Sequence, residues 1–259
     1  MQALDSLDQV RPKDMSVQEW RLRLELAACY RLYDFLGWTE MIYNHITVRI
    51  PDSPHDNPQY LINPYGLHYA EVTARNLVKT DVQVTLSGDS EYPINPARFT
   101  IHSAIHGARH DAQCVMHTHT TAGMAVACKK DGLRYDNFYT ALLYDQVAYH
   151  DFEGITTDPQ ECTRLVSSIG QKNILILRNH GLLVAGADVP SAFQTMWTVQ
   201  RGCEIQLASD QVRGENIPIS DDILKSNPQR RVMQADSRPG QLLFDGMLRR
   251  AGIRYADLA

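Results

Sequence analysis

The chain has 259 residues, of which 44% are apolar and 21% are charged, and its formal net charge is -5 at pH 7. This composition is typical of an ordinary globular protein, and the absence of a basic surplus argues against nucleic acid as a partner. No run of about 18 apolar residues occurs, so we expect no membrane span and no membrane partner. Five cysteines that form no C-x-x-C pair predict reduced thiols in a cytoplasmic protein.

The first part of the chain predicts one helix followed by strands. Residues 1–15 are polar and acidic and are expected to form a loose leader, and residues 16–259 to form a single domain. Ser16 and Glu19 have the spacing of a capping box, which predicts a helix that starts here and continues over 17–38. Alternating β-branched and apolar residues then predict strands at 45–50, 59–69 and 81–88, the second broken at Asn63-Pro64-Tyr65-Gly66 and the third ending at Gly88.

The remainder of the chain alternates between strands and helices. Apolar residues at helical spacing predict helices at 97–109, 121–130, 161–170, 189–212 and 240–253. A short buried strand is expected at 112–119, and a strand, a turn and a second strand at 173–186. Strands flanked by helices, rather than a run of hairpins, predict an α/β fold in which helices sandwich a sheet.

The strongest chemical signal is a pair of histidines one residue apart at the end of the strand at 112–119. Side chains i and i+2 of a strand point to the same face, so His117 and His119 are expected to project together. His180 lies at another strand end, where Gly181 permits a tight turn. Three imidazoles suit a borderline divalent ion, with metal–nitrogen bonds of about 2.0–2.1 Å. We therefore predict a metal site, against the simpler alternative of polar ends on buried strands.

The same residues carry a family resemblance. The stretches "YNHITVRI", "LINPYGLHY", "FTIHSAIHGARHDAQCVMHTHT", "AYHDFEG", "LRNHGLLVAG" and "RGCEIQLAS" resemble the class II aldolase/adducin family, and most closely its adducin-like branch. The resemblance spans roughly residues 20–255. It implies a three-layer α/β/α fold with a central mixed or mainly antiparallel sheet. It also implies a zinc site at His117, His119 and His180, with Fe²⁺, Mn²⁺ or Co²⁺ as alternatives, and a homotetramer.

One departure from the family pattern bears on the reaction. The sugar-phosphate aldolases of the family carry two serines that hold phosphate and a glutamate that carries a proton. The corresponding positions here are Pro96, Ala97 and Arg98. A guanidinium accepts no proton at neutral pH, but it can hold a carboxylate through two hydrogen bonds. We therefore interpret Arg98 as a substrate-binding and catalytic candidate for a carboxylic acid, with a surface ion pair as the alternative.

Other site candidates follow from the resemblance. Tyr139 lies near the position of a tyrosine that protonates the carbanion across a subunit interface in the aldolases, with aromatic packing as the alternative. Asn44, Asn63 and Gly66 fall in the two loops that bind substrate in the relatives, and ordinary turn chemistry is their alternative. Among the other histidines, His102 is interpreted as a core residue or one that supports the metal site, His106 as lying at a helix or subunit surface, and His45, His68 and His150 as structural. A second metal pair at His102 and His106 is less favoured.

These observations lead to one favoured function and two alternatives. The favoured function is a divalent-metal-dependent lyase, an aldolase or decarboxylase that cleaves a C–C bond through a metal-stabilised enolate. Its small-molecule substrate is expected to be a carboxylate or carbonyl compound rather than a sugar phosphate. The alternatives are a non-catalytic adducin-like assembly module and a non-haem Fe(II) oxygenase on the same fold.

Overall fold

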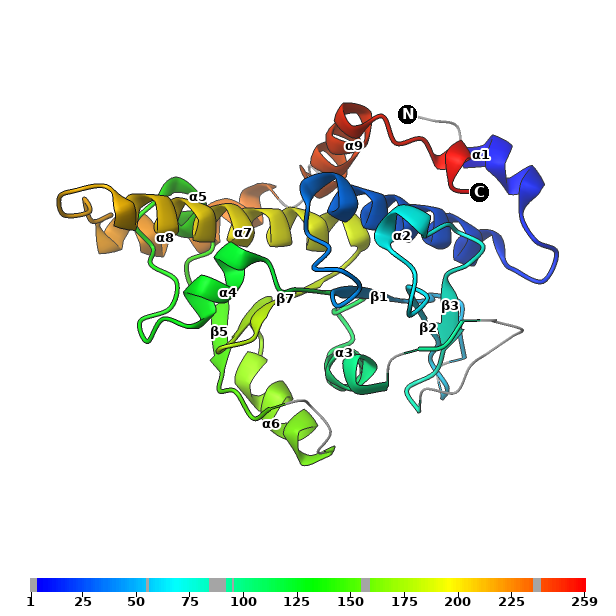
Figure 1. Ribbon diagram of the computed structural model, residues 1–259, viewed down its shortest axis with the longest axis horizontal. Coiled ribbons are helices and arrows are strands. Elements are labelled where there is room, and N and C mark those ends of the chain that lie inside the picture. The colour runs from blue at the N-terminus through cyan, green and yellow to red at the C-terminus, as the bar shows by residue number, and fades with distance from the viewer. Residues whose placement is uncertain (1–3, 55, 84–91, 95, 155–158, 235–238) are drawn as a thin grey trace.

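The computed structural model describes residues 4–54, 56–83, 92–94, 96–154, 159–234 and 239–259 (Figure 1). Within these residues, one sheet has the strand order β3-β2-β1-β4-β7-β6-β5. Only β5 and β6 pair in parallel, so the sheet is mixed and mainly antiparallel, as predicted. The strands are β1 (His45–Arg49), β2 (Tyr60–Ile62), β3 (Val78–Thr80), β4 (Cys114–Thr118), β5 (Val147–His150), β6 (Ile174–Leu177) and β7 (Gly181–Gly186).

Helices cover both faces of this sheet (Figure 1). One face packs against α2 and α7, with α9 packed on these two helices, and the opposite face packs against α3 and α6. The predicted three-layer α/β/α fold is therefore confirmed. The helices are α1 (Leu4–Leu7), α2 (Val17–Leu36), α3 (Pro96–Ala108), α4 (Thr121–Ala127), α5 (Phe138–Leu142), α6 (Pro159–Ile169), α7 (Val189–Gln211), α8 (Asp221–Gln234) and α9 (Pro239–Ala251), with 3-10 turns η1 (Asp8–Val10), η2 (Tyr69–Glu71) and η4 (Tyr255–Asp257).

The alternation of side chains along each strand divides the core in two. In β4, Cys114 and Met116 belong to the larger apolar cluster beneath α2 and α7. Val115, between them, belongs to the smaller cluster beneath α3 and α6. Because successive side chains point to opposite faces, the same rule assigns a face to every polar residue further along these strands.

The predicted start of α2 is correct, but only half of its capping box forms. Ser16 Oγ accepts a hydrogen bond from the backbone N–H of Glu19 at 3.0 Å. The Glu19 carboxylate instead accepts from Arg23 and Lys79, each at 2.8 Å. Glu19 is almost fully buried, and a buried carboxylate needs charged or hydrogen-bonding partners. This explains why two cations, rather than the helix terminus, take both of its oxygens.

Several predicted elements differ from the structure. Of the third predicted strand, residues 81–83 form a turn and 84–88 lie outside the described residues, whereas β3 occupies 78–80. The Asp81 carboxylate accepts from the backbone N–H of Gln83 at 3.0 Å, and such aspartate turns end strands. Three further elements, β5, α5 and α8, were not predicted, because their apolar patterns are short or weak.

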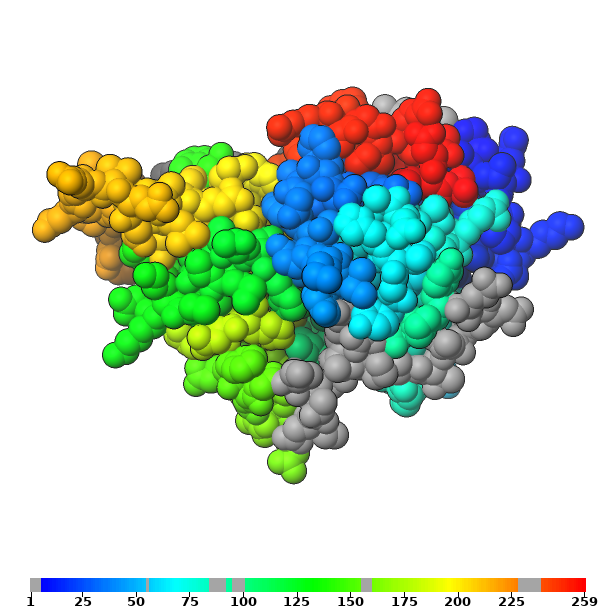
Figure 2. Space-filling model, viewed as in Figure 1, coloured from blue at the N-terminus to red at the C-terminus, as the bar shows by residue number. Residues whose placement is uncertain are grey.

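The N-terminal residues contact α2. Trp20 Nε1 donates a hydrogen bond to the Leu7 carbonyl at 2.9 Å, and Arg21 pairs with Asp8 at 2.7 Å. At the other end of the molecule, the connection between α7 and α8 projects beyond the main body (Figure 2). All five cysteines are free thiols. No helix in the described ranges is both long enough and apolar enough to cross a bilayer.

Candidate metal centre

Strand direction brings five histidines to one edge of the sheet. Both β4 and β6 run antiparallel to β7, and β5 runs parallel to β6, so β4, β5 and β6 end at the same edge. Because β1 runs antiparallel to β4, it begins there. The histidines at this edge are His45 at the start of β1, His117 and His119 at the end of β4, His150 at the end of β5, and His180 in the β6–β7 turn.

The pleat of β4 decides which side of the sheet the site occupies. Val115 faces the α3 and α6 layer, so His117, two residues later, faces the same layer. Thr118 faces the opposite side, where its hydroxyl lies 3.6 Å from the sulfur of Met196 in α7. This placement of His117 is consistent with the expectation that His117 and His119 project from one face of the strand.

The structure brings together the three histidines predicted as metal ligands. One ring nitrogen from each of His117, His119 and His180 lies within 4.8 Å of the others. The Nε2 atoms of His117 and His119 are 2.6 Å apart. The His180 ring centroid is 4.8 Å from each of the other two. His117 is buried and the other two are half-buried, which leaves one side of the cluster accessible.

The protonation state of this cluster suits a metal ion. His117 Nδ1 donates to the Leu182 carbonyl at 2.9 Å, which leaves the Nε2 lone pair directed at the other imidazoles. Burial and the neighbouring His119 and His180 hold the pKa of His117 well below its ordinary value. Burial also lowers the pKa of His180. Neutral imidazoles with a fixed tautomer are the form that coordinates divalent ions, so these residues fit the predicted metal.

Gly181 is required next to His180 for a reason other than the one predicted. The left-handed backbone conformation in the turn belongs to Asn179, with φ 58°. At Gly181 a Cβ atom would collide with the backbone carbonyl oxygen of Thr118 on β4. Close approach of two strands, and not turn flexibility, therefore excludes a side chain at this position.

Asn44 holds the backbone at His119. Its Oδ1 accepts from the His119 N–H at 2.9 Å. Its Nδ2 donates to the Trp38 carbonyl at 2.8 Å and to Glu40 Oε2 at 2.6 Å. The side chain is fully buried, so these contacts position the loop that carries one of the three imidazoles. Its predicted contact with substrate stays a prediction.

The other predicted substrate residues occupy the loop after β2. Asn63 is buried, and its Oδ1 lies 3.0 Å from the buried hydroxyl of Tyr30. That hydroxyl also donates to the Ile46 carbonyl at 2.6 Å, so it ties α2 to β1 and β2. Gly66 is exposed, has φ 108°, and has open space where a side chain would be. Only Gly66 of this pair is freely accessible to a ligand.

Tyr139 and Arg98 lie on different helices. Tyr139 is half-buried in α5 and packs edge-on against Trp197 of α7, with ring centroids 5.4 Å apart. Arg98 is in the first turn of α3, and its side chain lies outside the described residues. Ile101, one turn further along α3, lines a pocket that His180 also lines. The catalytic roles of both residues stay predictions.

A buried column of imidazoles lies behind His117. The His45 ring is 5.3 Å from the His117 ring and 4.1 Å from that of His102. Thr47 Oγ1 lies 2.7 Å from His102 Nδ1 and 2.8 Å from His106 Nε2. The prediction that His106 lies at a surface was wrong, because α3 turns both of its histidines toward β1 and His106 is fully buried.

One carbonyl group sets the proton positions along this column. The Ala112 carbonyl only accepts, so His106 Nδ1 donates to it at 2.8 Å, and His106 Nε2 carries a lone pair. The Thr47 hydroxyl therefore donates to His106 and accepts from His102 Nδ1. Both imidazoles are neutral: burial lowers the pKa of His106 to about 3 and that of His102 well below its ordinary value. Two sequence features could have indicated this cluster. His102 and His106 are four residues apart and so share one face of α3, and Thr47 lies on the opposite face of β1 from the apolar Ile46 and Val48.

A small pocket of about 10 Å³, room for about one water molecule, lies beside His180. This volume is below the ~300–1,000 Å³ typical of sites for drug-sized ligands. Its lining combines apolar residues from α3 and β6 with charged residues that follow β5 and β6 and one carboxylate from α6. The lining residues are Ile101, His150, Asp151, Phe152, Glu153, Gly154, Glu161, Leu177, Arg178 and His180.

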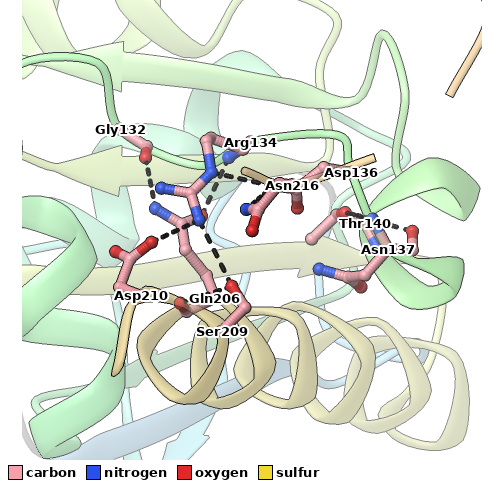
Figure 3. A network of polar contacts seen from close by, with 9 residues as sticks. All are labelled: Gly132, Arg134, Asp136, Asn137, Thr140, Gln206, Ser209, Asp210 and Asn216. Carbon is pink, nitrogen blue, oxygen red and sulfur yellow. Dashed lines mark hydrogen bonds and ion pairs between the residues drawn. The ribbon is translucent and has the colours of Figure 1, made fainter. Parts of the chain in front are cut away.

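A larger, open depression lies near the end of α7, away from the three histidines. Its main polar group, Arg134, is paired with Asp136 at 2.8 Å and with Asp210 at 2.6 Å (Figure 3). Gln206 accepts from the Arg134 backbone N–H and donates to the Gly132 carbonyl. These contacts fasten the segment before α5 to α7, so we interpret the depression as structural.

The fold and the site define a three-layer α/β/α protein with a three-histidine centre at a sheet edge. Residues 24–207 match the family model described as the class II aldolase and adducin N-terminal domain. The chain therefore belongs to the class II aldolase and adducin family, as the sequence motifs predicted.

Three relatives illustrate the range of this family. A putative aldolase class 2 protein of Pseudomonas aeruginosa is 40% identical over 253 residues, 96% of each chain. Alpha-adducin of Rattus norvegicus is 45% identical over 189 residues, which are 72% of this chain and 25% of the adducin. The structure of L-fuculose 1-phosphate aldolase from Glaciozyma antarctica superposes with a TM-score of 0.78 and 26% identity, covering 96% of this chain and 98% of that one.

Proposed function

We propose that this chain is a divalent-metal-dependent lyase acting on a small carbonyl or carboxylate compound. The observation that carries the proposal is the convergence of His117, His119 and His180, with ligand nitrogens within 4.8 Å of one another. These three imidazoles would hold the ion, with zinc as the favoured metal. A divalent ion there would act as a Lewis acid on a substrate carbonyl oxygen, which favours cleavage of the adjacent C–C bond.

The surrounding residues prepare the site for this role. The Leu182 carbonyl fixes the tautomer of His117, and Asn44 fixes the backbone of His119. Such contacts behind metal ligands raise affinity by keeping each ring in its binding orientation. The half-buried faces of His119 and His180 leave access for a small substrate.

The substrate class follows from the first turn of α3. Pro96, Ala97 and Arg98 replace the two serines and the glutamate of the sugar-phosphate aldolases. The fold of an L-fuculose 1-phosphate aldolase is shared, but the serine hydroxyls expected to hold phosphate in the sugar-phosphate aldolases of the family have no counterpart at these positions. Arg98 supplies a cation that suits a carboxylate, so we propose a 2-oxo or 2-hydroxy acid as substrate.

Metal analysis with matched variants tests the metal site. We expect about one divalent ion per chain in the purified protein and a loss of at least 90% of it in His119→Ala, because two imidazoles hold an ion poorly. His110→Ala is the control, since His110 is exposed beyond α3. Elemental analysis measures the stoichiometry and separates zinc from iron, the metal that the oxygenase alternative requires. Metal content unchanged in His119→Ala would refute the proposed ligand set.

A substrate screen tests the reaction. Cleavage or decarboxylation of 2-oxo and 2-hydroxy acids is measured with and without chelator, and with Arg98→Ala. We expect turnover that the chelator abolishes and that Arg98→Ala weakens by raising KM. Turnover by Arg98→Ala equal to that of the unmodified protein would refute the carboxylate role of Arg98.

A non-catalytic assembly module is the second candidate. The observation that favours it is the 45% identity to alpha-adducin over 72% of this chain. Absence of both metal and chelator-sensitive turnover would favour this candidate over the lyase. We also propose a homotetramer, to be measured by analytical ultracentrifugation, where a monomer would refute it.

A further inference from the structure

The segment that presents the His119 imidazole is supported from behind by α7. Side chains at the end of β4 alternate, so that His119 belongs to the metal centre while its neighbours Thr118 and Thr120 contact α7. Thr118 lies against Met196 and Thr120 against Gln200, and these two residues of α7 share one helix face because they are four positions apart. One face of α7 therefore lies directly behind this metal ligand.

The contact between Thr120 and Gln200 is a short hydrogen bond whose direction is fixed by its surroundings. Gln200 Nε2 donates to the Glu204 carboxylate at 2.9 Å, because a carboxylate only accepts. Gln200 Oε1 is therefore an acceptor, and the Thr120 hydroxyl donates to it at 2.5 Å. The Thr120 oxygen in turn accepts from the backbone N–H of Gly123 at 3.3 Å. The chain of hydrogen bonds thus runs in one direction, from Gly123 to Glu204.

Burial makes this chain of hydrogen bonds hard to rearrange. Thr120 and Gln200 are each only 4% exposed, so water cannot replace either partner. Breaking their hydrogen bond would leave buried polar atoms without partners, which is costly. At the far end, Arg201 holds the Glu204 carboxylate at 2.7 Å. Arg201 and Glu204 both belong to the stretch "RGCEIQLAS", for which the family resemblance implied no role.

The first turn of α4 transmits this support to the imidazoles. Thr120 directly follows His119 and is the N-cap of α4. Gly123, in the same turn, lies so close to β7 that a Cβ atom there would be 2.8 Å from the Leu182 side chain. The Leu182 carbonyl accepts from His117 Nδ1. The turn therefore continues the chain from one metal ligand and contacts the residue that orients another.

We propose that Gln200 is a positioning residue of the metal centre, an inference that rests on the proposed metal-dependent function. Gln200 is not a ligand, but through Thr120 it holds the backbone that places the His119 imidazole toward the ion. Asn44 holds the backbone N–H of His119 itself, so the link between β4 and α4 is fixed both at the ligand and immediately after it.

Competition for Zn²⁺ between the protein and a chelating dye measures the effect. Methionine has nearly the size of glutamine but cannot donate a hydrogen bond and accepts one only weakly. We expect Gln200→Met to bind Zn²⁺ roughly 10–100-fold more weakly than the unmodified protein. Thr120→Val should weaken binding to the same extent, whereas Thr120→Ser, which keeps the hydroxyl, should restore most of the affinity. The double variant should bind no more weakly than Gln200→Met, because both residues act through one hydrogen bond.

Gln206 supplies a matched control on the same helix. It is also buried, and its side chain accepts from the Arg134 N–H and donates to the Gly132 carbonyl, away from the three histidines (Figure 3). Gln206→Met should lower the urea midpoint as Gln200→Met does, with unchanged Zn²⁺ affinity. The visible absorption of bound Co²⁺, which depends on the arrangement of its ligands, is the second readout. We expect an altered spectrum in Gln200→Met and the unmodified spectrum in Gln206→Met.

Three outcomes decide the matter. Gln200→Met that is destabilised like Gln206→Met, but keeps the Zn²⁺ affinity and Co²⁺ spectrum of the unmodified protein, overturns the inference. Equal Zn²⁺ affinity in Thr120→Val and Thr120→Ser also overturns it, and this comparison holds even if Gln200→Met does not fold. Both results leave the ligand set standing, because His119→Ala tests that separately. Unmodified protein that binds neither ion overturns the proposed function, and this inference with it.

Discussion

Acid should destabilise the metal-free protein through the buried column behind His117. His106 is fully buried and neutral, and burial lowers its pKa to about 3 from an ordinary value of 6.5. Because the folded-state pKa lies below the unfolded value, the unfolded chain takes up the proton first. Stability is therefore undiminished above pH 6.5 and falls as the pH drops toward 3.

The size of this effect follows from linkage. At pH 5, about 1.5 units below the ordinary pKa of histidine, protonation of His106 stabilises the unfolded chain. The free energy of unfolding therefore falls by about 2 kcal/mol, at 1.36 kcal/mol per unit. Burial also lowers the pKa of His102, so its protonation in the unfolded chain acts in the same direction. The contribution of His106 alone, about 2 kcal/mol, is a substantial share of the ~5–15 kcal/mol typical of a folded domain.

The assay is urea unfolding at pH 7.5 and pH 5 with chelator present, followed by circular dichroism. His106→Asn keeps a donor for the Ala112 carbonyl but has no titrating ring. We expect its loss of stability between the two pH values to be about 2 kcal/mol smaller than in the unmodified protein. His110→Asn, at an exposed position, serves as the control. An equal loss in all three proteins would refute the claim that His106 is buried and neutral.

Two further substitutions probe the framework of the metal centre. Asn44→Ala removes three hydrogen bonds made by a buried side chain; we expect a loss of about 2–4 kcal/mol in urea unfolding and roughly 10–100-fold weaker metal binding in competition with a chelating dye. Unchanged metal affinity would show that Asn44 does not orient His119. Gly181→Ala places a Cβ against the Thr118 carbonyl, so we expect a loss of at least about 2 kcal/mol and reduced metal content. Gly107→Ala, at an exposed position of α3 with open space beside it, is the comparison for the cost of a methyl group, and equal effects at the two glycines would contradict the close-approach argument.

Local pattern determined much of this protein from sequence alone. Ser16 marks the start of α2 because a helix leaves its first N–H groups unpaired and a serine satisfies one of them. Strand alternation placed His117 and His119 on one face, because a pleated strand has only two faces. The motif Asn179-His180-Gly181 marked the third imidazole. These inferences depend on residues within a few positions of one another, so no knowledge of the fold was needed.

Contacts between distant segments were decided only by the tertiary structure. The burial of His106 depends on how α3 packs against Thr47 of β1, 59 positions away in the chain. The need for Gly181 arises from the Thr118 carbonyl on a neighbouring strand. The end of β5 and the first turn of α6 bring Glu153 and Glu161 close to the ring of His150, although neither carboxylate could be placed there from sequence spacing. Sequence spacing shows which face a side chain occupies, but only packing shows what lies across from it.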